Sequence, residues 1–400
     1  MRYIVKITTI FILGVNYMYS QAQELPFNQD FIDLVENNSS TLNAYKEKIE
    51  ADKLVARVNL NPQNPEARIS RTNNGDSFNQ EIEITQELDF PTVYSNKRHI
   101  SKLEQDQLET SLRFFKRDVV CKAYSKLVYF TYCKNMFNIH QERSSRISNI
   151  KMHMQEKFKL GDISGIELTK ANMEASILQS KVNKYHTELI NAKKELAYYI
   201  GDVDKQEGVM QLISSKNMVF KDDSLNKASL KSKWVEQNTG VNEAIFMYLI
   251  SDKNIGLAKA QSWPKFSIGY RRDENQSIAM NGVALGMSIP LWENKNTVKQ
   301  AKANKAFAQS YEADKRILAE LHFEKLYQEI VENKQILQLL KNSFREEEIE
   351  SQLSSSLEEG YISVLEYFNQ LEAYHQIEDE LQERERSYKL AYIELLKVEL

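Results

Sequence analysis

Two long stretches of the chain carry apolar residues at intervals of three, four and seven positions, with charged residues between them. In the first stretch this stripe consists of Val93, Ile100, Leu108, Leu112, Phe115, Val119 and Leu127. Such a repeat is typical of a helix that packs on other helices as a coiled coil. Because neither stretch contains proline, we predict long helices over residues 92–159 and 292–358. A returning helix follows each of them, over residues 165–200 and 364–398.

Shorter stretches in front of both long helices alternate between apolar and polar or small residues. The apolar set in the second half is Phe266, Ile268, Tyr270, Val283, Leu285, Met287 and Ile289. The apolar set in the first half is Phe78, Ile82, Ile84 and Leu88, which alternate with Glu81, Glu83 and Glu87. A period of two predicts β-strands with one face in an apolar medium. We therefore predict strand pairs at about residues 66–89 and 265–290.

The strand pairs allow two interpretations. Their strands, about 9–11 residues long, suit tilted membrane strands, but a soluble hairpin packed on the helices would show the same pattern. Trp263 and Trp292 lie just outside the second pair, where a membrane protein places interfacial aromatic residues. The two tryptophans favour the membrane interpretation.

An internal repeat relates the two halves of the chain. Pro91 and Pro290 lie 199 residues apart, as do Gly161 and Gly360. The same offset relates Asn43, Pro65, Ile163, Ser164, Glu167, Ala192 and Leu196 to Asn242, Pro264, Ile362, Ser363, Glu366, Ala391 and Leu395. One register shared without gaps indicates duplication. We expect a first repeat over residues 23–201, a connecting segment over 202–236, and a second repeat over 237–400.

The beginning of the sequence has the features of an export signal. Arg2 and Lys6 precede a short apolar core, and Ser20 and Ala22 offer small residues for cleavage. An uncleaved anchor is the alternative, but the core is shorter than the roughly 20 residues that span a bilayer. We expect cleavage after residue 22. No later run of about 18 apolar residues predicts a transmembrane helix, so a membrane location would require strands.

Composition and motifs exclude several functions. A net charge of −4 without a basic block gives no case for nucleic-acid binding. Cys121 and Cys133 lie twelve residues apart in one helical stretch, too far to bridge, and are expected as buried apolar residues. No nucleophile, phosphate-loop or other catalytic motif occurs, so we predict neither an enzyme nor a cofactor. His140, Met152, His153 and Met154 do not share a helix face well, and we interpret them as surface residues, not metal ligands.

The layout as a whole resembles the TolC-type outer-membrane efflux proteins. After the signal, the order of helix, strand pair, long helix, glycine turn and return helix occurs twice, over essentially the whole mature chain. The local marks are the strand exits Leu88-Asp89-Phe90-Pro91 and Ser288-Ile289-Pro290-Leu291-Trp292, and the turns Leu160-Gly161-Asp162-Ile163-Ser164 and Glu359-Gly360-Tyr361-Ile362-Ser363.

The resemblance implies a fold and a set of partners. It implies a mainly helical protein with membrane strands, in which three copies share a twelve-stranded β-barrel in the outer-membrane lipid and build a helical tunnel through the periplasm. It implies a passive exit duct that docks on a periplasmic adaptor and serves an inner-membrane pump. The form of the exit at residues 289–292 is similar to that of members that work with proton-driven pumps.

The resemblance also carries over individual residues. The adaptor-contact residues would be Leu160, Gly161, Asp162, Ile163, Ser164, Gly360, Tyr361, Ile362 and Ser363. A glycine that ends a helix explains both turns equally well, and the two roles are compatible. The family's acidic entrance constriction falls on Glu366 and Asn369, of which only Glu366 is acidic. Glu366 could equally be a helix N-terminal carboxylate stabilised by the helix dipole.

A periplasmic coiled-coil adaptor or scaffold without a membrane barrel is the main alternative function. Adaptors resemble a single helical hairpin flanked by β-domains, whereas here two whole halves repeat. The transported substrate cannot be read from the sequence, because a duct of this kind passes whatever its pump delivers.

Overall fold

The chain is mostly helical and contains one antiparallel sheet. The computed structural model describes residues 27–58, 60–75, 77–202, 226–275, 278–343 and 349–400. Compact packing divides the chain into two units. The tip unit comprises residues up to Asn38, Val120–Leu225 and Ile330–Leu400, and the sheet unit comprises Ser39–Val119 and Asn226–Glu329.

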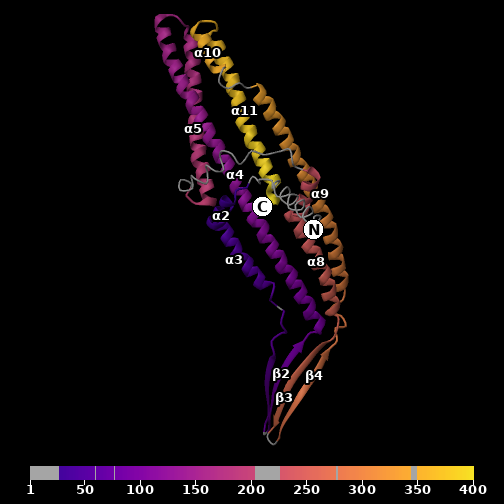
Figure 1. The fold of residues 1–400 in the computed structure, drawn as a ribbon. Helices are drawn as coiled ribbons and strands as arrows, with labels where there is room; N and C mark the ends of the chain where they lie inside the picture. Colours follow the sequence, from indigo (N-terminus) through magenta and orange to yellow (C-terminus); the bar gives the residue numbers. More distant parts are fainter. Residues whose placement is uncertain (1–26, 59, 76, 203–225, 276–277, 344–348) are drawn as a thin grey trace, which may run out of the picture. The chain divides into compact units, whose positions relative to one another are not determined.

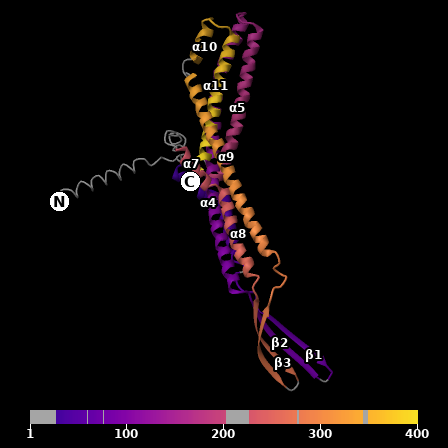
Figure 2. The ribbon, with the colours of Figure 1, turned by 90° about the vertical axis from the view of Figure 1, so that its right-hand side faces the viewer.

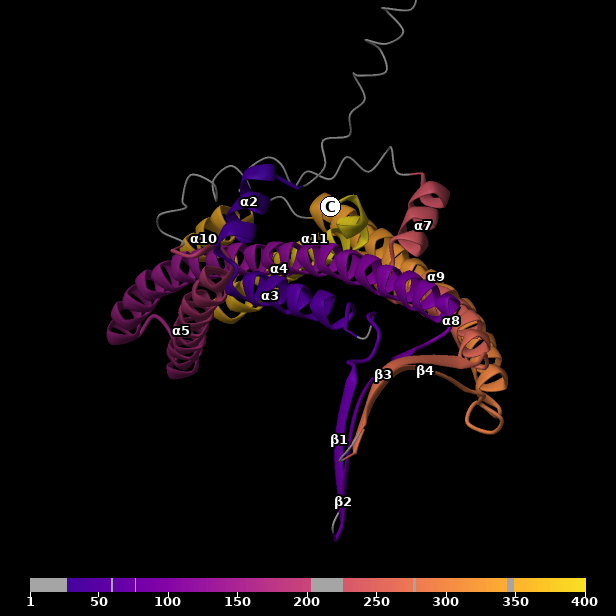
Figure 3. The same ribbon diagram turned by 90° about the horizontal axis from the view of Figure 1, so that it is seen from below.

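The sheet unit contains four strands: β1 (Glu66–Asn74), β2 (Ser77–Leu88), β3 (Lys265–Asn275) and β4 (Ala279–Ser288). They form one antiparallel sheet in the order β1-β2-β3-β4, and β3 and β4 bend along their length (Figure 3). Strands from the two halves of the chain meet at the centre, where Glu83 of β2 pairs with Arg271 of β3. The two predicted strand pairs therefore form a single sheet.

The pairing register gives the sheet two different faces. Directly paired residues share a face, and alternate residues along a strand do the same. One face carries Ile69, Ile82, Ile84, Leu88, Phe266, Ile268, Tyr270, Val283, Leu285 and Met287, and becomes polar near the turns at Arg272 and Asn281. The other face carries Glu66, Arg68, Ser70, Glu81, Glu83, Thr85, Glu87, Lys265, Ser267, Gly269, Arg271, Gly282, Ala284, Gly286 and Ser288. We call them the apolar face and the polar face.

Ion pairs connect neighbouring strands on the polar face. Arg271 of β3 lies 2.9 Å from Glu81 of β2, and Lys265 lies 3.3 Å from Glu87. Small residues let the strands approach closely. A Cβ added to Gly269 would lie 2.9 Å from the carbonyl oxygen of Ile84, so a larger side chain there would force the backbone to shift.

Helices accompany the sheet within its unit. They are α3 (Ser40–Val55), α7 (Lys227–Glu236), α8 (Thr239–Ala260), and parts of α4 (Pro91–Leu160) and α9 (Thr297–Ser343). The short helix α7 is anchored on α9 by Trp234, which is 1% exposed and donates its indole N–H to the carbonyl of Ala319 at 3.2 Å. Lys227 and Lys231 add ion pairs to Glu324 and Glu320, at 2.7 and 3.0 Å.

The described residues of the tip unit lie mostly in helices. They are α2 (Gln29–Asn38), the remainder of α4, α5 (Gly165–Ile200), the remainder of α9, α10 (Ile349–Glu358), α11 (Val364–Leu396) and a final 3₁₀ turn (Lys397–Glu399). The turns that join α4 to α5 and α10 to α11 lie at the same end in two perpendicular views (Figures 1 and 2). We call α4–α5 the first hairpin and α10–α11 the second hairpin.

A shared apolar core holds the two hairpins together. It is composed of Ile147, Met154, Ala171, Leu178, Leu353, Val364, Tyr367, Phe368 and Leu371. At about 1.5–3 kcal/mol for each large buried side chain, this core is a major source of stability in the tip unit. Cys121 and Cys133, both buried and unbridged, confirm the interpretation of these cysteines as small apolar residues.

The second long helix differs from its prediction at its start. We expected it from residue 292, but α9 begins at Thr297. Asn296 has a φ of 70°, which a right-handed helix cannot include, and turn hydrogen bonds join Lys295 to Trp292 and Thr297 to Asn294. Asparagine tolerates this conformation, so the segment forms turns before the helix starts. Whether the helix runs unbroken to residue 358 depends on residues 344–348, which lie outside the described residues, as do the predicted signal and residues 203–225.

Candidate functional sites on the tips and the sheet

Both hairpin tips have the same backbone construction. Gly161 ends α4 with a φ of +83°, and Gly360 ends α10 with a φ of +78°. After Gly161 the N–H of Asp162 returns to the carbonyl of Lys157 at 2.9 Å, and after Gly360 the N–H of Tyr361 returns to the carbonyl of Ser356 at 2.8 Å. These are Schellman turns, which favour glycine because of its freedom at positive φ.

A capping box starts the return helix at each tip. The Ser164 hydroxyl accepts from the N–H of Glu167, whose carboxylate accepts from the N–H of Ser164 at 2.7 Å. Ser363 and Glu366 make the same reciprocal bonds at the second tip, where the N–H of Ser363 donates to Glu366 at 2.9 Å. Each box satisfies backbone N–H groups that a helix start would leave unpaired. The tips are therefore rigid, locally encoded turns.

The predicted tip residues divide into exposed and supporting ones. Leu160 is 76% exposed and Tyr361 is 78% exposed, an unusual state for large apolar or aromatic side chains. Ile163 and Ile362 are half-buried and pack against the shared core. The remaining members are exposed: Gly161, Asp162, Ser164, Gly360 and Ser363.

Glu366 and Asn369, the predicted constriction residues, lie exposed in the first part of α11. The carboxylate of Glu366 already accepts hydrogen bonds from Ser363, and these bonds hold the pKa of Glu366 below its usual value. The capping role foreseen for a helix N-terminal carboxylate is thus present. It keeps Glu366 negatively charged, which a constriction role also requires.

Trp263 and Trp292 lie at the end of the sheet where β3 begins and β4 ends. Lys265 and Ser288, the residues that open β3 and close β4, are directly paired, so both tryptophans flank one end of the sheet. Trp263 is 56% exposed and stacks on Phe90 with ring centroids 5.1 Å apart, whereas Trp292 is 80% exposed.

The apolar face and the two edge strands are the sheet's unusual features. Val283 is 74% exposed, Leu285 is 79% exposed and Ile69 is 70% exposed. Strands β1 and β4 form the edges, and within the described residues neither has a partner on its outer side. A single copy therefore presents an apolar surface together with unpaired strand edges, a combination that soluble proteins avoid.

The interpretation of His140 and Met154 as surface residues is wrong. His140 is 0% exposed and Met154 is 3% exposed, whereas Met152 and His153 are exposed. Spacings of three and four place His140 and Met154 on the buried stripe of α4 that also carries Met136, Arg143 and Ile147. Continuing the three- and four-residue spacing of the apolar stripe without requiring an apolar residue at each step would have predicted that His140, Met154 and Arg143 are buried.

Two general features of the described residues bear on function. None of their helices combines the length and the apolar character needed to cross a bilayer. Among the same residues, no group of three or more histidine, cysteine, aspartate or glutamate side chains is arranged to hold a metal ion.

Comparison with known proteins identifies the fold. No protein-family model and no curated protein matches the sequence. Solved structures do match. The Campylobacter jejuni CmeC outer membrane channel is 14% identical with a TM-score of 0.70, covering 92% of this chain and 84% of that one. The outer membrane protein VceC from Vibrio cholerae is 10% identical with a TM-score of 0.69, covering 92% and 95%. A membrane protein from Pseudomonas aeruginosa is 12% identical with a TM-score of 0.74, covering 92% and 89%.

These neighbours share their architecture with this chain over nearly its whole length. The resemblance to TolC-type channels inferred from the strand exits and glycine turns is confirmed at the level of the fold.

Proposed function

We propose that this chain, which has the fold of outer-membrane channels, is the outer-membrane exit duct of a tripartite efflux or secretion system. It passes substrates delivered by an inner-membrane pump and a periplasmic adaptor, and it carries out no chemical reaction. The observation that carries the proposal is the four-stranded sheet, whose apolar face is exposed in a single chain and whose edge strands β1 and β4 have no outer partner among the described residues.

The apolar face fits a lipid environment. Burying Ile69, Val283 and Leu285 in hydrocarbon instead of water would be favourable by roughly 1.5–3 kcal/mol for each side chain. Trp263 and Trp292 would lie at the level of the lipid headgroups, where amphipathic aromatic rings are favoured. The polar face, with its ion pairs and small residues, would line a water-filled interior.

The free edges fit a ring of three copies. In lipid an unpaired strand edge costs several kcal/mol for each unsatisfied backbone group, so β1 and β4 need partners. If β4 of one copy pairs with β1 of the next, each contact is head-to-tail and rotation closes the ring. With four strands per copy, three copies give the twelve-stranded barrel that the family resemblance implies.

The helical part would form the periplasmic tunnel. The two repeats, residues 23–201 and 237–400, would each contribute one hairpin, with residues 202–236 connecting the repeats along the chain. The tips would receive the adaptor, through the exposed Leu160 and Tyr361 and the turns beside them. Glu366 and Asn369 would narrow the entrance. From the form of residues 289–292, we extend the proposal to a proton-driven pump.

Fractionation of cells tests the membrane assignment. We expect the full chain to sediment with the outer membrane, to require detergent for release, and to migrate as a trimer when unheated. A soluble periplasmic monomer would contradict the proposal and favour the adaptor or scaffold alternative.

Cysteine crosslinking to a co-expressed adaptor tests the docking end. We expect efficient trapping from Leu160→Cys and Tyr361→Cys. Glu142→Cys, at an exposed position far from the turn on the same helix α4, provides the control. Stronger trapping from Glu142→Cys than from the tips would contradict tip docking while leaving the membrane assignment intact.

A further inference from the structure

A cluster of ionic contacts connects the two hairpins inside the tip unit. Arg143 of α4 is only 3% exposed, yet it carries a charge. Its guanidinium donates to Asp379 of α11 at 2.7 Å, to the adjacent Glu378, and to the carbonyl oxygen of His375 at 3.3 Å. Lys181 of α5 reaches the same Asp379 at 3.4 Å. One aspartate thus holds cations from both helices of the first hairpin.

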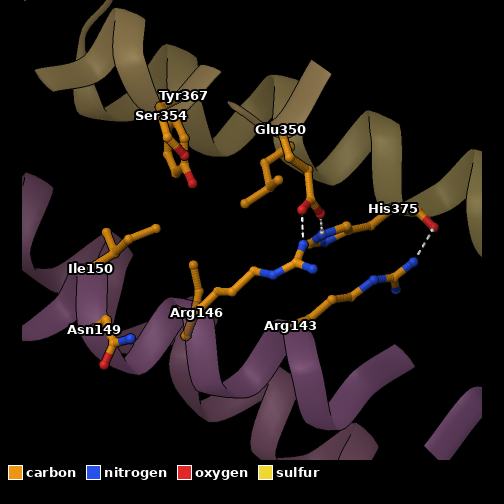
Figure 4. A pocket seen from close by; sticks show the side chains of 10 residues that line it. Arg143, Arg146, Asn149, Ile150, Glu350, Ser354, Tyr367 and His375 are labelled. Carbon is orange, nitrogen blue, oxygen red and sulfur yellow. Dashed lines mark hydrogen bonds and ion pairs between the residues drawn. The ribbon is translucent and has the colours of Figure 1, made fainter. Parts of the chain in front are cut away.

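Glu350 of α10 makes the corresponding contacts on the other side of the cluster. Its carboxylate pairs with Arg146 of α4, and one of its oxygens lies 3.4 Å from Nε2 of His375 on α11. Figure 4 shows the Arg146 guanidinium and the His375 ring meeting at Glu350, with Arg143 beside them. The pair of Glu350 with Arg146 links α10 to the first hairpin, and the contact with His375 links α10 to α11.

The charges of the cluster balance when its imidazoles are neutral. The first hairpin supplies three cations, Arg143, Arg146 and Lys181, and the second hairpin supplies three carboxylates, Glu350, Glu378 and Asp379. Residues 349–383 contain nine acidic residues and no lysine or arginine. Glu380 and Glu383 pair with Arg384 and Arg386 of α11 itself, whereas Glu350, Glu378 and Asp379 pair with cations of the first hairpin. Protonating both histidines would leave two excess positive charges in this partly buried site.

His140 lies at the centre of the cluster. It is 0% exposed, its ring stacks on Tyr185 with centroids 5.0 Å apart, and its Nε2 has no hydrogen-bond partner. Asp379 lies 3.9 Å from that nitrogen and favours a proton there, while Arg143 and Lys181 oppose it. Burial outweighs the aspartate, and the pKa of His140 is lowered to about 4.

The pKa of His375, on α11, is also set by burial and by nearby charges of both signs. Its side chain is 12% exposed. Burial, Arg143 and Lys181 disfavour its protonation, whereas Glu378 and Asp379 favour it. Its pKa is also lowered to about 4, with burial as the largest cause. Glu350, which also pairs with Arg146, lies 3.4 Å from Nε2 of His375. Both imidazoles are therefore neutral in the closed cluster at neutral pH.

A cavity adjoins the cluster and gives water a place to enter. It has a volume of about 210 Å³ and is lined by residues that include Arg143, Arg146, Glu350, Ser354, Tyr367 and His375. His375 is the histidine that lines this cavity, and a charged His375 that separates from its neighbours can be hydrated there, beside the polar groups of Arg143, Arg146 and Glu350.

We propose that this cluster is an acid-released clasp, in which protonation of His140 and His375 weakens the attachment of the second hairpin to the first. The released state takes up protons that the closed state excludes, so acid favours release. Between the ordinary histidine pKa of 6.5 and the lowered value of about 4, each fall in pH shifts the equilibrium toward release. The clasp lies within the tip unit and does not depend on the membrane assignment.

Hydrogen exchange of the detergent-solubilised full chain at about pH 7 and pH 5 tests the clasp. With pKa values of about 4 closed and 6.5 open, linkage predicts that protection falls about twentyfold for each imidazole that controls release. We expect this loss, after correction for the intrinsic exchange rate, in peptides from α10 and the facing part of α11.

Neutral variants identify the protons responsible. We expect His140→Asn combined with His375→Gln to remove most of the acid response. His153→Gln, an exposed histidine on the same helix α4, should leave it unchanged. If the double variant does not fold at pH 7, His375→Gln alone provides the test, because the His375 side chain is partly exposed. It should make the acid-induced loss of protection about twentyfold smaller. Equal protection of wild-type α10 at both pH values, or a full acid response in the folded histidine variants, would overturn the proposal.

Discussion

The carboxylate of Glu366 accepts hydrogen bonds from both the backbone N–H and the hydroxyl of Ser363, each at 2.9 Å. Glu167 and Ser164 repeat this arrangement at the other tip, with distances of 2.7 and 2.8 Å. The chain thus contains two carboxylates in the same local structure, of which only Glu366 occupies the position that the family resemblance assigns to the entrance. Comparing variants of Glu366 and Glu167 can therefore distinguish the capping role, which both carboxylates have, from a role in ion passage, which only Glu366 would have.

Exchanging these two carboxylates for amides tests the constriction. Glutamine keeps the capping geometry and removes the charge, so Glu366→Gln and Glu167→Gln should have similar, small effects on stability. In planar bilayers, Glu366→Gln should lower the preference for cations, because three copies of the charge would otherwise ring the entrance. Glu167→Gln should leave it unchanged. Equal selectivity of wild type and both variants would reject the constriction role.

Two adjacent positions of β4 test which face of the sheet meets lipid. Val283 lies on the apolar face, whereas Gly282 lies on the polar face directly opposite Arg271. A glutamate at Val283 should cost on the order of 1–2 kcal/mol per copy in lipid and reduce the yield of trimer in the outer membrane. Gly282→Glu has open space around its Cβ and a cation nearby, and should assemble normally. A lower trimer yield for Gly282→Glu than for the glutamate at Val283 would indicate that the polar face, and not the apolar face, meets lipid.

We expect Gly161 and Gly360 to be required because their backbone has positive φ, and not because a larger side chain would lack space. At Gly161 and Gly360 no atom lies within 4 Å of an added Cβ, but both have positive φ. Alanine should therefore destabilise each tip by about 1–2 kcal/mol through backbone strain alone. Hydrogen exchange of peptides spanning the turns measures this effect. Gly282→Ala, where φ lies outside the strained range, provides the control, and a comparable loss of its local protection would contradict the explanation.

Trp234 should contribute far more to holding α7 than the ion pairs around it. Trp234→Phe removes the indole donor to Ala319 and should cost about 1 kcal/mol, while Trp234→Ala should cost about 3–5 kcal/mol. Lys231→Ala breaks exposed pairs to Glu320 and Glu324, for which we expect the smallest effect of the three, because solvent screens exposed ion pairs. Exchange of α7 amides ranks the three variants. A larger effect of Lys231→Ala than of Trp234→Ala would contradict this order.

The elements of the fold are largely predictable from the sequence because their signals are local. The helix predicted over 92–159 corresponds to Pro91–Leu160, since proline starts it and glycine ends it. The alternation of Val283, Leu285 and Met287 predicts a strand that the structure has at Ala279–Ser288. What joins the strands of the two halves into one sheet is long-range pairing, which no local pattern specifies.

The parts that were missed are those in which polar residues occupy apolar positions. His140 and Arg143 interrupt the buried stripe of α4, and their partners Glu378 and Asp379 lie more than 230 residues away along the chain. A buried charge is tolerated only with such partners, and the sequence does not show which carboxylates fold back onto it. Asn296 is a related case, because one residue with positive φ delays the start of α9.

The tip turns also fix the rotational register of the helices that they join. Because the capping box fixes where α5 begins, one residue inserted into α5 just after Ser164 would move the following residues by about 100° around the helix axis and turn Ala171 and Leu178 away from the shared core. A few consecutive residues thereby determine which side of a 36-residue helix faces inward. Since these residues are adjacent in the chain, the register can be set as soon as each hairpin forms, before distant partners such as Arg143 and Asp379 meet.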